Sequence, residues 1–180
     1  MGLRIVDFSQ LTAAQRVQAA HVLEAAFAHL PAAFDGAFAE EVQTFFTELG
    51  RAAWAALDGD AVVGWVGRIE GYEYAWELHP LAVHPAAQRR GVGSALVALL
   101  EERARAAGML TVYLGTDDEF DGTNLFGQEL FPDVAGKIAG VVETNGHPFA
   151  FYRKLGYEIT GLVPHANGFG KPDILMAKRL

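Results

Sequence analysis

Residues Leu81 to Leu100 read LAVHPAAQRRGVGSALVALL, and this stretch predicts the central unit of the fold. An apolar run stops at Pro85, and a polar turn from Gln88 to Ser94 leads directly into a helical pattern. The apolar residues of that pattern recur with the spacing of one helix face, at Val92, Ala95, Leu96 and Leu99. The stretch therefore predicts a strand, a glycine-containing turn and an amphipathic helix in immediate succession.

The turn has the chemistry of a phosphate-binding site. At a helix start the backbone N–H groups lack partners and the helix dipole is positive. Gly91 and Gly93 lack the Cβ atoms that would keep a ligand from the backbone, and Arg89 and Arg90 can pair with phosphate. The residues match neither G-x-x-x-x-G-K-[ST] nor G-x-G-x-x-G, which argues against nucleoside-triphosphate and dinucleotide sites. The alternative is an ordinary turn, since glycines are common at helix starts.

Length, composition and charge limit the class of protein. A chain of 180 residues predicts a single α/β (α+β) domain over residues 1–180. No apolar run approaches the roughly 18 residues of a membrane span, and the N-terminus lacks the apolar core of a signal peptide. We therefore expect a cytoplasmic protein without a membrane partner. The net charge of −8 disfavours nucleic acid and is compatible with a cationic partner.

Cysteine and histidine usage narrows the possible chemistry. The chain has no cysteine, which excludes disulfides, thiolate metal ligands and a cysteine nucleophile. The six histidines show no metal-ligand spacing, so no metal is expected. His84 and His147 each precede a proline and are expected to have structural roles.

The remaining elements follow from apolar periodicity and from helix and turn signals. Thr12 and Gln15 form a capping-box pattern ahead of an apolar helical stripe that continues to Leu30 and that Pro31 ends. A second helix is expected over 38–49, and the 31–36 link is free to line a site. A short helix is expected to start at Pro148. Strands are expected at 4–8, 52–57, 61–68, 76–83, 110–114, 157–163 and 174–178.

Two motifs together resemble those of the GNAT superfamily of acetyl-CoA-dependent N-acetyltransferases. Q-R-R-G-V-G at 88–93 resembles the pyrophosphate signature Q/R-x-x-G-x-G/A, and 149–157 resembles the segment A-x-x-F-Y-x-K-x-G-[FY]. Shorter stretches resemble the aminoglycoside 6'-N-acetyltransferases, in particular the chromosomal, dimeric enterococcal branch; these stretches are 76–81, 115–119, 147–148, 164–168 and 171–174. The resemblance covers about residues 50–180.

The resemblance implies a fold, a cofactor and partners. The fold would be a central, mixed and twisted sheet of about six or seven strands flanked by about four helices. The acyl donor would be acetyl-CoA, the acceptor a cationic aminoglycoside, and the assembly a homodimer. Backbone N–H groups of 89–94 would hold the pyrophosphate, and the pantetheine arm would pair with the strand that carries Leu81. The implied cofactor-binding residues are Leu81, Ala82, Val83, Gln88, Arg89, Arg90, Gly91, Val92, Gly93, Ser94 and Tyr152.

Candidate catalytic residues follow from the needs of acetyl transfer. With no cysteine for an acyl-enzyme, direct attack by the amine in a ternary complex is the simpler route. Glu77 and His79 lie two apart on one expected strand and share a face, from which a proton could be accepted. In the resembled branch the residues that match Glu77, His79, Leu81 and Tyr152 are implicated in catalysis. The Tyr152 hydroxyl would protonate the leaving thiolate, and an N–H near Leu81 would stabilise the oxyanion.

Structural alternatives stay open for each of these residues. Glu77 could pair with a neighbour, or anchor the amine while solvent takes the proton. His79 could simply pack, Tyr152 could be a half-buried core residue, and Gln88 is expected to be structural.

Several carboxylates are candidates for binding a cationic substrate, because several positive charges need clustered negative ones. The candidates are Glu77, Asp117, Asp118 and Asp173. Asp117 and Asp118 follow an expected parallel strand, at the sheet edge where α/β sites usually lie; the alternative is a solvated acidic surface. Two rival functions remain: a GNAT enzyme for a polyamine, peptide or metabolite amine, and a non-catalytic acyl-CoA-binding module.

Overall fold

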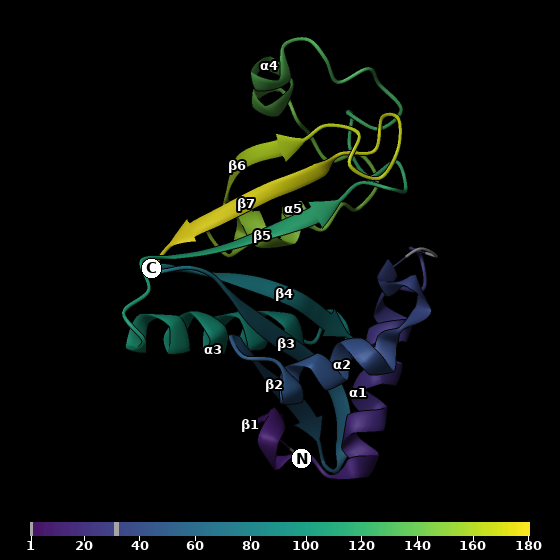
Figure 1. Ribbon diagram of the computed structural model, residues 1–180. Helices are drawn as coiled ribbons and strands as arrows, with labels where there is room; N and C mark the ends of the chain where they lie inside the picture. The colour runs from purple at the N-terminus through teal and green to yellow at the C-terminus, as the bar shows by residue number, and fades with distance from the viewer. Residues whose placement is uncertain (1, 31–32) are drawn as a thin grey trace. The chain divides into compact units, whose positions relative to one another are not determined.

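A computed structural model describes residues 2–30 and 33–180. Within these residues the chain has seven β-strands and five α-helices. It forms two compact units, one running to Leu110 and including Leu180, the other comprising Thr111–Arg179. Each unit is described by itself (Figure 1). The prediction of one domain over residues 1–180 stays a prediction.

The first unit contains four antiparallel strands in the order β1-β2-β3-β4. The strands are β1 (Arg4–Asp7), β2 (Arg51–Asp58), β3 (Ala61–Tyr72) and β4 (Ala75–Val83). The helices are α1 (Ala13–Ala26), α2 (Phe38–Thr47) and α3 (Val92–Ala106). The predicted capping box is confirmed, because Thr12 accepts from the Gln15 N–H and Gln15 accepts in return. Helix α1 ends at Ala26, short of the predicted Leu30, and the predicted stop at Pro31 lies outside the described residues.

Helices cover both faces of this four-stranded sheet. Trp65 on β3 is fully buried and donates from its indole N–H to the Ala19 carbonyl of α1 at 3.0 Å. A Cβ on the neighbouring residue, Gly64, would lie 3.1 Å from Val92 of α3. Because successive strand residues point to opposite faces, α1 lies on one face and α3 on the other (Figure 1). Helix α2 packs beside α1, where Phe45 meets the Trp65 ring edge-on at 5.4 Å.

Strand β4 bulges against β3 at the residues that follow Leu78. Val66 pairs with Leu81 and Arg68 pairs with Leu78, so that Gly67 alone lies opposite His79 and Pro80. A Cβ on Gly67 would lie 2.4 Å from the His79 carbonyl oxygen and 2.5 Å from the Phe45 ring. A glycine is therefore required for α2 to approach the bulged strand this closely.

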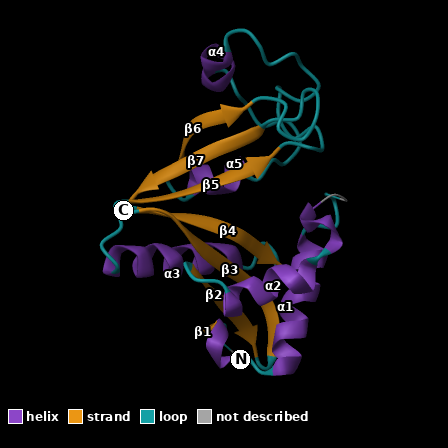
Figure 2. Ribbon diagram, viewed as in Figure 1, coloured by secondary structure: helices purple, strands orange, loops and turns teal. Residues whose placement is uncertain are grey.

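The second unit contains three antiparallel strands in the order β5-β7-β6. The strands are β5 (Thr111–Asp117), β6 (Glu158–Val163) and β7 (Asp173–Arg179), and the helices are α4 (Val134–Ala139) and α5 (Phe149–Lys154). Loops, teal in Figure 2, make up much of the rest. The long segment after β5 is anchored by the buried side chains of Leu125 and Leu130. Strand β5 reaches Asp117, three residues beyond the predicted end.

Candidate active site

The turn before α3 is built to leave its backbone open. His84 caps a short 3-10 helix by accepting from the Ala86 N–H at 3.2 Å, and Gln88 donates to the Val83 carbonyl at 3.1 Å. The ladder of α3 begins where Ala95 N–H donates to the Gly91 carbonyl at 3.0 Å. The N–H groups of 92–94 precede that ladder and point out of the helix start. Gln88 and His84 thus make the structural contacts expected of them.

The surroundings of this turn fit a diphosphate. Gly91 has a φ of +82°, and a Cβ there would meet no atom within 4 Å, so the space over the helix start is open. Arg89 is exposed, also with a positive φ of 60°. Arg90 contacts Asp58, the last residue of β2, at 3.3 Å, and the two side chains are 60% and 38% exposed. Such a surface pair contributes little free energy, so a phosphate can replace Asp58 as the partner of Arg90.

Glu77 and His79 lie on the face of β4 that α2 covers. Both are half-buried, and Glu77 pairs in register with Ile69 of β3. The Nε2 atom of His79 lies 3.6 Å from Oε1 of Glu41 on α2, and 39% of the His79 side chain stays exposed. The Phe34 ring packs against the imidazole at a centroid distance of 5.8 Å. The described part of the 31–36 link therefore contributes a side chain beside His79.

Glu41 is a charged residue of this group that sequence reasoning missed. Its Oε1 accepts from Nη1 of Arg51 at 3.0 Å, and only 16% of its side chain is exposed. The hydrogen bond to His79, followed by the charges of His79 and Arg51, holds the pKa of Glu41 below its usual range. No sequence signal marked Glu41, because the contact depends on how α2 packs against β4.

Tyr152 lies on α5 in the second unit. The side chain is buried, with its ring against those of Phe151 at 5.1 Å and Tyr157 at 5.6 Å. Burial raises the pKa of the Tyr152 phenol, so the hydroxyl stays protonated and can act as a hydrogen-bond or proton donor. Tyr152 is therefore a buried residue, and not the half-buried one that the structural alternative described.

Two of the predicted carboxylates meet at the end of β5. Asp117 and Asp173 are direct partners in the β5–β7 register, and both are half-buried. The Asp173 carboxylate lies over Gly115, where a Cβ would come within 2.7 Å of Oδ2. Asp117 accepts a hydrogen bond from the Asn167 amide. Like charges placed opposite each other on a sheet are unfavourable, so this pair favours a bound cation.

Asp118 differs from its neighbour. It is fully buried, and its carboxylate accepts from Gly122 N–H at 2.8 Å, Thr123 N–H at 2.9 Å and the Thr123 hydroxyl at 2.7 Å. A carboxylate that closes its own loop in this way has little capacity left for a ligand. The geometry favours a structural role for Asp118 over the predicted substrate contact.

His147 joins the end of β5 to the start of α5. Its Nδ1 accepts from Phe149 N–H at 3.2 Å, so the proton lies on Nε2, which donates to the Asp117 carbonyl at 3.2 Å. The ring is buried and stacks on Phe120 at 5.8 Å. Burial lowers the pKa of His147, outweighing the opposing effect of Asp118. His147 therefore ties the helix of Tyr152 to the strand of Asp117.

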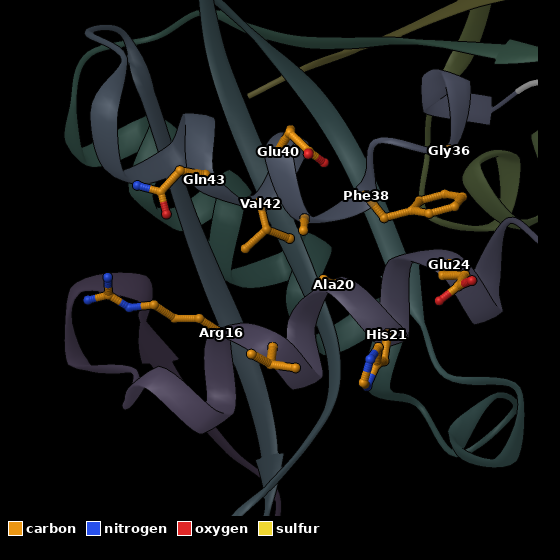
Figure 3. Close-up of a pocket in the computed structure, with 11 residues that line it drawn as sticks. Arg16, Ala20, His21, Glu24, Gly36, Phe38, Glu40, Val42 and Gln43 are labelled. Carbon is orange, nitrogen blue, oxygen red and sulfur yellow. The ribbon is translucent and has the colours of Figure 1, made fainter.

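Other features of the described residues do not carry the predicted chemistry. A cleft of about 430 Å³ lies between α1 and α2, lined by residues such as Ala20, Glu24, Phe38 and Glu40 (Figure 3). None of the predicted site residues lines it. No group of three or more potential metal ligands occurs within 2–30 and 33–180. None of the helices in these ranges is both long enough and apolar enough to span a bilayer.

The bulged strand, the open glycine turn and the start of α3 are the parts of an acyl-CoA-dependent N-acetyltransferase. The model of the acetyltransferase (GNAT) family matches residues 19–126, and the chain belongs to this family. The predicted GNAT fold is thereby confirmed. Within the described residues its seven strands agree with the expected six or seven, and its five α-helices are one more than the roughly four expected.

Among solved structures, the chain is similar to enzymes of one kind within this family. An aminoglycoside 6'-N-acetyltransferase complexed with coenzyme A is 38% identical with a TM-score of 0.89, over 98% of this chain and 96% of that one. The aminoglycoside 6'-N-acetyltransferase from Enterococcus faecium is also 38% identical, with a TM-score of 0.86 and the same coverage. An aminoglycoside 6'-acetyltransferase type Ii is 34% identical with a TM-score of 0.74. A comparison with curated proteins gave no match.

Proposed function

We propose that this chain transfers the acetyl group of acetyl-CoA to the 6'-amine of aminoglycoside antibiotics and so confers resistance to them. One observation carries the proposal: aminoglycoside 6'-N-acetyltransferases share 34–38% of its residues over 98% of the chain. The facing carboxylates of Asp117 and Asp173 support it, because an aminoglycoside carries several ammonium groups.

The turn before α3 is assigned to the donor. When bound, acetyl-CoA supplies the thioester that the amine attacks. Backbone N–H groups of 92–94 would hold its diphosphate at the positive end of α3, with Arg89 and Arg90 adding charge. Strand residues 81–83 would pair with the pantetheine arm, and a backbone N–H near Leu81 would face the developing oxyanion.

Proton transfers are assigned to side chains of β4 and α5. Glu77 and His79 would anchor the substrate amine and accept its proton, which leaves a neutral nucleophile for direct attack. The Tyr152 hydroxyl, kept protonated by burial, would donate to the departing thiolate. Asp117 and Asp173 would hold further ammonium groups of the drug, while Asp118 keeps its loop in place.

A thiol-release assay with acetyl-CoA and a panel of amines tests the proposal. We expect turnover with kanamycin and other 6'-amino drugs, and none with 6'-hydroxy congeners. Faster turnover of spermidine would favour the rival GNAT function on a polyamine. Coenzyme A binding without thiol release from any amine would favour the non-catalytic module.

Site variants separate the two halves of the reaction. Glu77→Gln should lower kcat/KM for kanamycin while the affinity for acetyl-CoA stays nearly unchanged. A large loss of acetyl-CoA binding in this variant would contradict the assigned role. If the protein is a non-catalytic acyl-CoA-binding module, acetyl-CoA binding is its only measurable property, and Tyr152→Phe should leave that binding unchanged.

We further propose that the protein acts as a cytoplasmic homodimer. Acetyl-CoA is made inside cells, and the resembled enterococcal branch is dimeric. Sedimentation velocity at micromolar concentration should give twice the 19.4 kDa chain mass. A monomer at that concentration would contradict this assignment without affecting the proposed reaction.

A further inference from the structure

We infer that Glu41 is a positioning residue that holds His79 so that one imidazole nitrogen faces the substrate amine. The inference rests on the proposed acetyl transfer and adds a residue that the sequence motifs do not contain. Its basis is the contact between Oε1 of Glu41 and Nε2 of His79 at 3.6 Å, an ion-pair distance made on the covered face of β4. Contacts of this kind are often long before substrate binds and shorten in the complex.

The contact at 3.6 Å favours one tautomer of His79. A carboxylate can only accept, so the proton of a neutral His79 imidazole is best placed on Nε2, which faces Glu41, and the lone pair is then on Nδ1. More than a third of the His79 side chain is exposed, whereas Glu41 is mostly covered. In the proposed arrangement Glu41 holds Nε2, and Nδ1 is the nitrogen left to accept a proton from the substrate.

This arrangement gives a balanced proton transfer. An N–H bond of the substrate ammonium breaks, Nδ1–H forms, and the electron pair left on the amine forms a C–N bond to the thioester carbon. The C–S bond then breaks, the leaving thiolate takes the proton of the Tyr152 hydroxyl, and the amide nitrogen loses its second proton to solvent. The resulting imidazolium faces the ionised Glu41, and the proton then passes from His79 to solvent. The logic is that of a carboxylate that orients and stabilises a histidine base.

The charges around His79 come from three elements. Glu77 lies on the same strand, two residues before His79. Helix α2 carries Glu41, and Glu48 lies at its end. From β2, Arg51 contacts Glu41 at 3.0 Å and Glu48 at 2.9 Å. Because Arg51 also pairs with Glu48, it does not fully neutralise Glu41, which is the carboxylate that contacts His79.

Glu48 provides a matched control, because it pairs with the same Arg51 from a position where 52% of its side chain is exposed. We expect Glu41→Gln to lower kcat/KM for kanamycin roughly tenfold, a size typical of coupled side chains, with KM for acetyl-CoA unchanged. Glu48→Gln should keep the wild-type kcat/KM. Equal effects of both variants would show that Glu41 acts only through Arg51, and would overturn the inference.

A double-mutant cycle isolates the contact itself. In a His79→Ala background, Glu41→Gln should cause no further loss of kcat/KM. Losses that simply add would overturn the inference.

Imidazole nitrogen shifts of His79, measured by NMR in the wild-type protein, need no substitution that could impair folding. The Nε2–H tautomer is expected, and the Nδ1–H tautomer would refute the proposed geometry. This measurement is independent of turnover, so it distinguishes failure of the inference from failure of the proposed acetyl transfer.

Discussion

Replacing Asp118 with alanine should unfold the second unit more easily rather than weaken a substrate contact. The substitution removes the acceptor of three hydrogen bonds, from Gly122 N–H, Thr123 N–H and the Thr123 hydroxyl. Both donor residues are buried, so water cannot easily replace the carboxylate. A buried donor left unsatisfied costs about 1–3 kcal/mol. Because the three bonds belong to one loop and are not additive, we expect a total loss of about 3–5 kcal/mol.

This loss is measurable by urea unfolding followed by circular dichroism. For a chain of this size it corresponds to a Tm lower by roughly 10 °C. Asp117→Ala is the matched control, because Asp117 is half-buried and accepts one side-chain hydrogen bond, from Asn167. It should change stability by less than about 1.5 kcal/mol and raise KM for the drug. The reasoning is refuted if Asp118→Ala keeps wild-type stability and raises KM as Asp117→Ala does.

Three further predictions concern packing, pH and the cofactor. Gly67→Ala forces a methyl group against the His79 carbonyl, so it should lower the free energy of unfolding by about 1–3 kcal/mol and also lower kcat. An unchanged stability and an unchanged kcat would contradict the close packing at the bulge. His147 has a lowered pKa, so below pH 6.5 the unfolded chain takes up a proton that the folded chain does not. Stability should therefore fall on acidification by up to about 1.4 kcal/mol per pH unit until the folded pKa is reached, and by less in His147→Gln. Gly93→Val should weaken coenzyme A binding, measured by calorimetry, at least about tenfold, because the side chain blocks the approach of the diphosphate to the backbone. An unchanged affinity would show that the diphosphate binds elsewhere.

Local patterns in the sequence were enough to predict most elements. The unit from Leu81 to Leu100 follows from apolar spacing, a proline stop and glycines, all of which act within a few residues. The capping box at Thr12 is likewise local. Helix α1 ends before its apolar stripe does. Leu30, the last residue of the stripe, is buried, but it lies in the turn that follows the helix. Burial alone cannot distinguish those two cases in a sequence.

The parts that escaped prediction depend on contacts between distant segments. Asp117 and Asp118 are adjacent in the same acidic run, yet one ends a strand and the other folds into a loop. Glu41 reaches His79 only because α2 packs over the β4 bulge, where Gly67 has no side chain. No spacing rule connects residues so far apart. Candidate residue types were thus predictable from the sequence, whereas their assignment to structure or catalysis required the packing.

The central claim is regioselective acetyl transfer, and the structure of the product tests it most directly. Kanamycin and acetyl-CoA should be incubated with the protein and the purified product analysed by mass spectrometry and two-dimensional NMR. The account predicts a single acetyl group on the 6'-nitrogen. An acetyl group on any other amine, or no acetylated product, would contradict it.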